Sequence, residues 1–565
     1  MRMPGRFSLA VILLPVIGTA FANRAAARPQ EQSGSAVTTV AQAIDHIIAR
    51  EHDESAVIRR YNPIVETYVQ DMKADPDMGI VPFHDHYYLG QASLAQGVVD
   101  ESMLDEKKKK SKVADLNPFA HLGGNEAYAP EGFLQMIYVD TNGFDREHYE
   151  FEYVGREFLG EVRCVVFDVT PLPKTGKRRF SGRIWAEDQG FSIVRFNGTY
   201  VSGEEGTGYN VHFDSWRLNL QPDLWLPAFV YSQESELKNS ASNIRFKAQT
   251  RLWGYALTSA GQFSTNEQQS LDSASPIADS DASHDRSPIE IERQWQQQAE
   301  VNVVSRLERI GLLAPRGEMD KILDTVVNNI EVTNNLDIQP EIQCRVMLTG
   351  TLESFSIGHT IVLSRGLIDT LPDEASLATM LAQELAAVIV TKPSTDQWGF
   401  NDTTNVTAAQ ALTRFSFKAT PAEVEMADKK ALELLKNSPY KDKLGNAALF
   451  LKQLSVDSQA LPALISARLG NGVGLSSGLA SLGPALQADK LDQVAALPLG
   501  ARVKVDPWSD RVELLRAKSV SLYSAREKMP FEVTPFMPYV TRYHEAAKSG
   551  SQPKSALASK DASSR

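Results

Sequence analysis

The sequence predicts an α+β protein in which one helix and an antiparallel sheet precede a mainly helical domain. Between residues 64 and 255, short segments alternate apolar and polar side chains, which is the period of β-strands. Residues 261–287 are rich in Ser, Asp and Ala and nearly lack apolar side chains, which is typical of a linker. From residue 288 onward the apolar spacing is mainly that of helices, so we place the domain boundary in the linker.

The composition is that of a globular protein with more than one core. The chain has 565 residues, 42% of them hydrophobic, which suggests two to four domains. Its net charge of −12 argues against a general nucleic-acid-binding protein. The two cysteines, Cys164 and Cys344, fall in different expected domains, so two buried thiols are favoured over a disulfide, although an oxidising compartment would permit one.

The first 22 residues have the pattern of a secretory signal peptide. Arg2 and Arg6 form a basic start, residues 7–17 are apolar, and Ala20-Phe21-Ala22 is a small-x-small cleavage site. The apolar run is short for a membrane span, and an uncleaved anchor is the alternative. We therefore expect a periplasmic or secreted protein, with residues 23–36 as a polar spacer.

Residues 37–260 are expected to form an antiparallel half-barrel sheet with one helix. The helix is predicted over 37–51, and residues 179–185 and 191–196 are predicted to pair as a hairpin. Further strands are predicted at 64–69, 151–154, 163–169, 209–218, 226–233 and 244–253. His84 and His86 would point the same way on a strand, but a metal site needs a third ligand, so we interpret them as surface histidines.

This pattern resembles the LolA, LolB and RseB type of half-barrel. The supporting residues are the Gly182-Arg183-Ile184-Trp185 strand with its partner, and Trp225-Leu226-Pro227 at the start of another strand. The resemblance implies a concave apolar face that could hold a lipid, a lipoprotein or another protein partner. The alternative, which we favour, is that the aromatic side chains of this region fill a closed core.

The second domain is expected over residues 288–545, followed by a disordered tail over 546–565. Helices are predicted over 288–310 and 319–330, strands over 341–348 and 360–363, and a turn at Arg365-Gly366-Leu367. Asp373 and Glu374 then open a helix that is almost entirely apolar from 377 to 390. Its one charged residue past the first turn, Glu384, costs free energy unless something pairs with it.

The segment around this helix resembles the zinc metallopeptidase family of HtpX, the CAAX prenyl proteases and BepA, whose domains are of the gluzincin type. The order of motifs matches over about 35 residues, through Ser354-Phe355-Ser356, Ser364-Arg365-Gly366-Leu367, Asp373-Glu374-Ala375 and Leu381-Ala382-Gln383-Glu384-Leu385-Ala386-Ala387. In this family an H-E-x-x-H helix binds zinc through two histidines, and its glutamate activates the bound water.

The positions that this resemblance assigns to zinc ligands hold other residues. Gln383 and Ala387 stand where the two histidines would be, and Val424 stands where the family has its glutamate ligand. The His-Pro that tends to follow is matched by Asp506-Pro507. The resemblance therefore implies the scaffold without its metal site, and we expect no cofactor, although zinc is the cofactor of the family.

The function that this resemblance favours is a pseudo-metallopeptidase that binds polypeptide or envelope proteins without hydrolysing them. Glu384 would be a relic of the general base, and the segment Gly358, His359, Thr360, Ile361 and Val362 would be an edge strand that pairs with the bound chain. Two alternatives stay open. One is an active zinc metalloendopeptidase with a non-standard ligand set, and the other is a lipid or lipoprotein carrier acting through the N-terminal domain.

Overall fold

The computed structural model describes most of both expected domains. The described residues are 39–75, 79–95, 101–102, 130–141, 143–176, 178–201, 210–235, 246–257, 288–391, 417–458, 461–465, 469–472, 477–480, 503–506, 511–514 and 540–543. The expected signal peptide over 1–22, the spacer over 23–36, the linker over 261–287 and the tail over 546–565 lie outside them.

The first part of the chain folds into a ten-stranded sheet in which every neighbouring pair of strands is antiparallel. Its strand order is β3-β2-β1-β10-β9-β8-β7-β6-β5-β4, so β3 and β4 are its outermost strands. The strands are β1 (Tyr61–Asp75), β2 (Gly79–Gln91), β3 (Glu101–Ser102), β4 (Tyr149–Leu159), β5 (Val162–Pro171), β6 (Arg179–Glu187), β7 (Ile193–Val201), β8 (Asn210–Gln221), β9 (Leu224–Ser235) and β10 (Phe246–Leu257).

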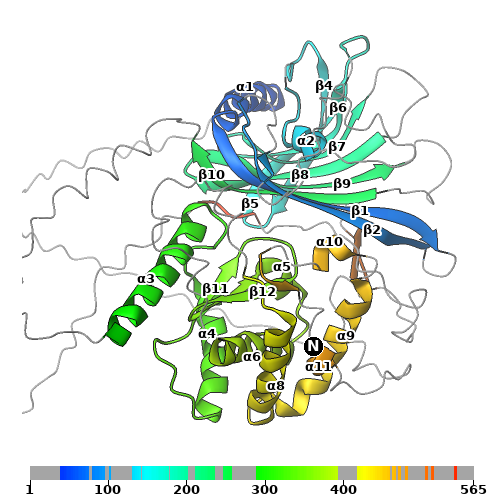
Figure 1. Ribbon diagram of the computed structural model, residues 1–565. Coiled ribbons are helices and arrows are strands. Elements are labelled where there is room, and N and C mark those ends of the chain that lie inside the picture. The colour runs from blue at the N-terminus through cyan, green and yellow to red at the C-terminus, as the bar shows by residue number, and fades with distance from the viewer. Residues whose placement is uncertain are drawn as a thin grey trace, which may run out of the picture.

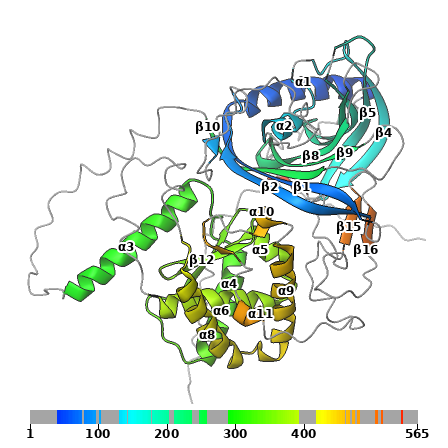
Figure 2. The ribbon, with the colours of Figure 1, turned by 45° about the vertical axis from the view of Figure 1, so that its right-hand side comes forward.

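The sheet curls around helix α1 (Val40–Ile58) and the short helix α2 (Pro130–Leu134), as Figure 2 shows. Helix α1 begins at a capping box in which the Thr39 hydroxyl accepts from the backbone N–H of Gln42. Its apolar side packs into the curl, together with α2 and the 3₁₀ helix η1 (Gln135–Ile137). The predicted α+β class and its antiparallel sheet are therefore confirmed.

The second part of the chain is mainly helical and contains a four-stranded sheet of order β11-β13-β12-β14. Strands β11 and β13 are parallel, and the other neighbours are antiparallel. The strands are β11 (Gln343–Met347), β12 (Glu353–Ile357), β13 (Thr360–Ser364) and β14 (Asn471–Gly472), with a separate hairpin of β15 (Val503–Asp506) and β16 (Arg511–Leu514). The helices are α3 (Pro288–Arg309), α4 (Glu318–Thr333), α5 (Arg365–Thr370), α6 (Glu374–Val390), α8 (Pro421–Lys436), η3 (Lys441–Lys443), α9 (Leu444–Asp457), α10 (Pro462–Ile465) and α11 (Ser477–Ala480).

Helix α6 lies at the centre of this second part, against α4, α8 and α9 (Figure 1). Its start follows from a side-chain cap, because the Asp373 carboxylate accepts from the backbone N–H of Ser376 at 2.8 Å. Most of its residues are buried, as the almost continuous apolar run predicts. The helix therefore places Glu384 inside the domain.

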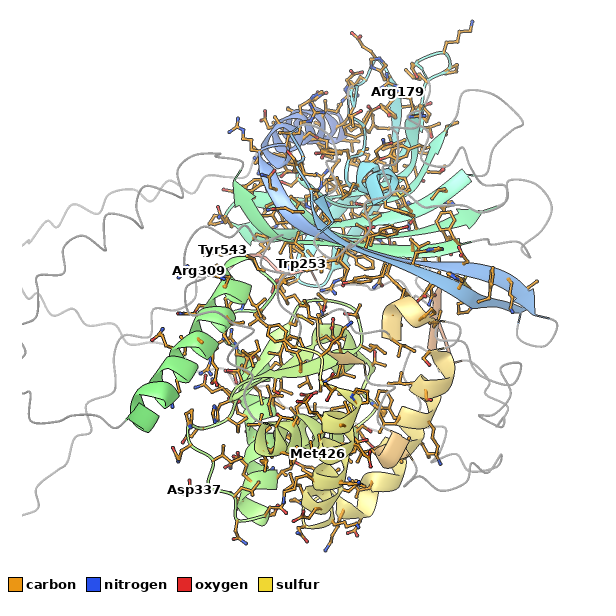
Figure 3. All side chains as sticks on the ribbon, in the orientation of Figure 1. Arg179, Trp253, Arg309, Asp337, Met426 and Tyr543 are labelled. Carbon is orange, nitrogen blue, oxygen red and sulfur yellow. The ribbon has the colours of Figure 1, made fainter. Side chains whose placement is uncertain are left out.

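Carboxylates of β1 and β2 join the large sheet to the second part of the chain. Asp85 accepts from the backbone N–H groups of Ala463 and Leu464, both at 2.9 Å, at the start of α10. Glu66 accepts from the backbone N–H of Gly350. Figure 3 shows Trp253 at the same junction, where its indole N–H donates to the Gly311 carbonyl at 2.8 Å. Because the Asp85 and Glu66 carboxylates are buried and would otherwise lack these donors, the bonds help to fix how the two parts sit against each other.

Several sequence predictions need correction. Helix α1 ends at Ile58 rather than at residue 51, and strand β2 was not predicted. The turn predicted at Arg365-Gly366-Leu367 is wrong, since these residues begin α5, where the Ser364 hydroxyl accepts from the Leu367 N–H.

Two further findings concern the thiols and the membrane. Cys164 and Cys344 are both free and buried, which confirms the prediction of unpaired thiols. Across the described ranges, no helix combines the length and the apolar character needed to cross a membrane.

Candidate functional site around Glu384

Glu384 lies in the third turn of α6 and faces strand β12. Its side chain is buried, with the residue 3% exposed, and the Ser354 hydroxyl of β12 donates to its Oε1 at 2.7 Å. Burial raises the pKa of the Glu384 carboxyl to about 7, and the hydrogen bond from Ser354 opposes the rise. The Ser354 hydroxyl is thus a partner of the kind that a carboxylate among apolar residues needs.

The neighbouring Gln383 is held by helix α8. Its amide N–H donates to Asp428 Oδ1 at 3.1 Å, and Asp428 is itself buried. Val424 lies one turn before Asp428 on the same face of α8, and Ala387 lies one turn after Gln383 on α6. The structure thus brings α6 and α8 together at the turns that carry the expected ligand positions. The Gln383–Asp428 hydrogen bond joins the two helices there.

The chemistry of these residues does not suit zinc. Zinc in proteins is bound by thiolates, imidazoles and carboxylates, and Ala387 and Val424 carry no donor atom. The Gln383 amide uses its N–H on Asp428. A general base also has to reach a proton on a substrate, whereas the Glu384 carboxylate is enclosed and bonded to Ser354. As arranged, Glu384 and Gln383 tie helix α6 to β12 and α8.

The expected edge strand is wrong, because Thr360, Ile361 and Val362 belong to β13, which is paired on both sides. Strand β13 lies between β11 and β12 and forms ladders with each. Gly358 and His359 form the turn that precedes it, where φ of Gly358 is +56°. The backbone N–H of His359 donates to Glu300 of α3 at 3.2 Å. Residues 358–362 therefore do not offer the unpaired backbone edge that strand addition needs.

Strands β12 and β4 both have residues whose outer edge is unpaired in the described part of the chain. Strand β12 pairs with β14 at Glu353 and Ser354, so three of its residues extend beyond that pairing. Strand β4 is the last strand of the large sheet and is 11 residues long. Three of its large apolar side chains, Tyr153, Val154 and Phe158, are exposed. In the described part of the chain, β4 is thus an outermost strand that bears three exposed large apolar side chains.

The structure also brings together a group that the sequence analysis did not find. Asp71 of β1 lies beside His84 and His86 of β2, and one ligand atom from each lies within 4.8 Å of the others. No third ligand was predicted because β2 and its register with β1 were not predicted. A signal was present in the alternation of the two histidines, which does place them on one face.

The concave side of the large sheet is filled by packed side chains. A cluster of buried residues from α1, α2, η1 and the inner faces of the strands occupies it, with Phe167, Phe180 and Phe213 fully buried. Arg217 from β8 also enters this region and pairs with Glu51 of α1 at 2.6 Å and Glu54 at 3.1 Å. This packing agrees with a closed core, the interpretation favoured from the sequence.

Comparison with known proteins adds no relative. No protein-family model matches the chain, and no curated protein matches it.

Proposed function

We propose that this is an extracytoplasmic, non-hydrolytic polypeptide-binding protein built in part on a metallopeptidase-like scaffold. The proposal combines the signal-like first 22 residues, the motifs around α6 and the chemistry of the residues at the ligand positions. The observation that carries it is the environment of Glu384, which is buried against Ser354. Beside it, the Gln383–Asp428 hydrogen bond joins α6 to α8. The Glu384 side chain enclosed in this way contacts β12, and the positions that the resemblance assigns to metal ligands hold Gln383, Ala387 and Val424.

We place the contact with polypeptide on strand β4. An unpaired strand edge binds an extended chain through backbone hydrogen bonds, while exposed side chains provide specificity. Strand β4 offers this edge over 11 residues, with Tyr153, Val154 and Phe158 as exposed apolar contacts. Strand β13 is excluded because it is paired on both sides, and β12 leaves three residues past its pairing with β14.

The charges of β4 indicate which segments would bind. Four charged residues are exposed on this strand: Glu150, Glu152, Arg156 and Glu157. The strand thus carries three carboxylates and one guanidinium. Glu157 also accepts from the indole N–H of Trp185 at 2.7 Å, which leaves the other two for a partner. We therefore expect extended segments that combine apolar and basic side chains. The bulge between Tyr153 and Gly155 and these charges also protect the edge from indiscriminate pairing.

The packed concave side favours a protein partner over an acyl chain. A lipid or lipoprotein carrier needs an apolar cavity, whereas the cluster inside the curl consists of contacting buried side chains. The carrier alternative predicts acyl chains that copurify with the protein and are found by mass spectrometry of its organic extract. The polypeptide-binding proposal predicts none.

The test is binding of a fluorescent, unfolded and basic polypeptide to the full chain and to Phe158→Glu. Phe158 is 69% exposed, so its replacement leaves the folded core unchanged. Burying a Phe side chain in a complex contributes about 1.5–3 kcal/mol, so the variant should bind at least 10-fold more weakly by fluorescence anisotropy.

The matched control is Val332→Glu on α4, since Val332 is 65% exposed and lies in the other part of the chain. We expect this variant to bind like the unmodified protein. Equal affinities for all three proteins would refute β4 as the binding edge. Equal losses in both variants would also refute it, because the loss would then not depend on the edge.

A further inference from the structure

We propose that Asp71, His84 and His86 form a binding site for a divalent transition-metal ion of the zinc type. His86 Nε2 lies 3.1 Å and His84 Nδ1 3.9 Å from the same Asp71 oxygen, Oδ2. The two imidazole rings are 5.1 Å apart between centroids. Three ligand atoms of the types that bind zinc therefore converge from two neighbouring strands.

The register of β1 and β2 creates this convergence. Asp71 pairs directly with His84, and the register then shifts so that Met72 pairs with Pro82, which makes Phe83 the extra residue of a β-bulge. His84 and His86 are two residues apart and so point to the same face, which is the face of Asp71. All three ligand atoms thus lie on one side of the ribbon.

The other side of the ribbon is anchored to the second domain. Asp85, between the two histidines, points to that side and accepts from two backbone N–H groups of α10 and from the Tyr68 hydroxyl. Because Asp85 is held by three hydrogen bonds, the backbone that carries His84 and His86 is fixed. A fixed backbone is the support that a metal site needs.

The kind of ion follows from the ligands. Two imidazoles and one carboxylate suit zinc and the neighbouring transition metals, whereas calcium and magnesium prefer oxygen ligands. Tetrahedral zinc with bonds of about 2.0–2.1 Å places its ligand atoms about 3.3 Å apart. The Asp71–His86 pair already has this spacing, and the His84 side chain, 56% exposed, can rotate to meet it. Three protein ligands leave a fourth position for water or for a donor from a partner.

The position of the site indicates what the ion would do. The pairing of β1 with β10 ends at Asp71 and Phe246 in the described residues, and from there β1 continues with β2 as a two-stranded ribbon to Asp75. Figure 1 shows the β1–β2 ribbon extending beyond the neighbouring strands. A two-stranded ribbon is marginally stable by itself. A metal ion that joins the strands where the ribbon leaves the sheet would stiffen it.

The test is calorimetric titration of tag-free, metal-stripped full-length protein with zinc chloride. We expect one zinc per chain at micromolar or lower Kd, and at least 10-fold weaker binding for His84→Asn and for His86→Asn. The matched control is His359→Asn, which removes an imidazole from the other domain, contacts Glu300, and should bind zinc like the unmodified protein.

A second measurement guards against loss of folding. The circular dichroism spectrum of each variant in the absence of metal should equal that of the unmodified protein, since His84 is exposed and His86 partly exposed. Absence of zinc binding by the unmodified protein would show a simple His–Asp ion pair and overturn the proposal. Binding that survives in the double variant His84→Asn/His86→Asn would also overturn it, by placing the zinc elsewhere.

Discussion

Replacing Glu384 with Gln should stabilise the protein at pH 8 and do so much less at pH 5. The folded-state pKa of Glu384 is about 7 against an ordinary value of 4.5, because burial disfavours the carboxylate. Between pH 4.5 and pH 7 the folded state holds a proton on Glu384 that the unfolded state has lost. Stability therefore falls as the pH rises from the first pKa to the second. A difference of this size corresponds to roughly 3 kcal/mol, which we take as an upper bound.

Glutamine has the same shape, remains neutral and can still accept the hydrogen bond from the Ser354 hydroxyl. The variant therefore avoids the loss of stability with rising pH. The assay is urea unfolding of both proteins at pH 5 and pH 8, followed by circular dichroism. The quantity compared is the difference in unfolding free energy between the two proteins at each pH. Other groups that titrate in this range, such as Glu54 with its pKa raised to about 7, cancel in the comparison. A difference that is the same at both pH values, or a variant that is less stable at pH 8, would refute a buried Glu384 whose pKa is raised.

Three further substitutions test the packing around the two domains. Arg217→Met removes the guanidinium that two buried carboxylates of α1 share, and we expect a loss of about 3–5 kcal/mol in urea unfolding; a loss under about 1 kcal/mol would contradict a buried ion network. Asp85→Ala leaves two backbone N–H groups of α10 without their acceptor, and should cost about 3 kcal/mol and speed limited proteolysis between the domains; unchanged proteolysis would argue against this contact. Gly358→Ala should lower the melting temperature, because φ is +56° and the added Cβ would lie 1.7 Å from Glu300 Cδ; an unchanged melting temperature would show that α3 does not pack there.

The sequence predicted the elements whose signals are local. The hairpin of β6 and β7 follows from alternating side chains on both sides of a turn, and its strands pair from Arg179–Val201 inward. Helix α6 follows from its Asp373 cap and its apolar run. The buried Glu384 was recognised because one carboxylate stood among apolar residues. In each case the information lies within about 20 residues.

What the sequence did not predict depends on contacts between distant segments. Strand β2 contains Pro82 and carries charged and imidazole side chains, so its sequence pattern resembles that of a loop. The hydrogen bonds of Asp85 with α10, which hold it in place, involve a distant segment. Strand β13 inserts between β11 and β12, and this order makes the supposed edge an inner strand. Asp71 reaches His84 and His86 through a bulge whose register no local pattern encodes. Pairing order and register are properties of the assembled sheet.

One measurement tests most directly whether this protein binds polypeptide without cleaving it. The full-length protein and Glu384→Gln are incubated with an unfolded polypeptide and zinc, and new N-termini are counted by mass spectrometry while binding is followed by anisotropy. We expect saturable binding by both proteins and no new N-termini, because Gln383, Ala387 and Val424 supply no zinc ligands. Zinc-dependent cleavage that disappears in Glu384→Gln would contradict it and establish a working metallopeptidase.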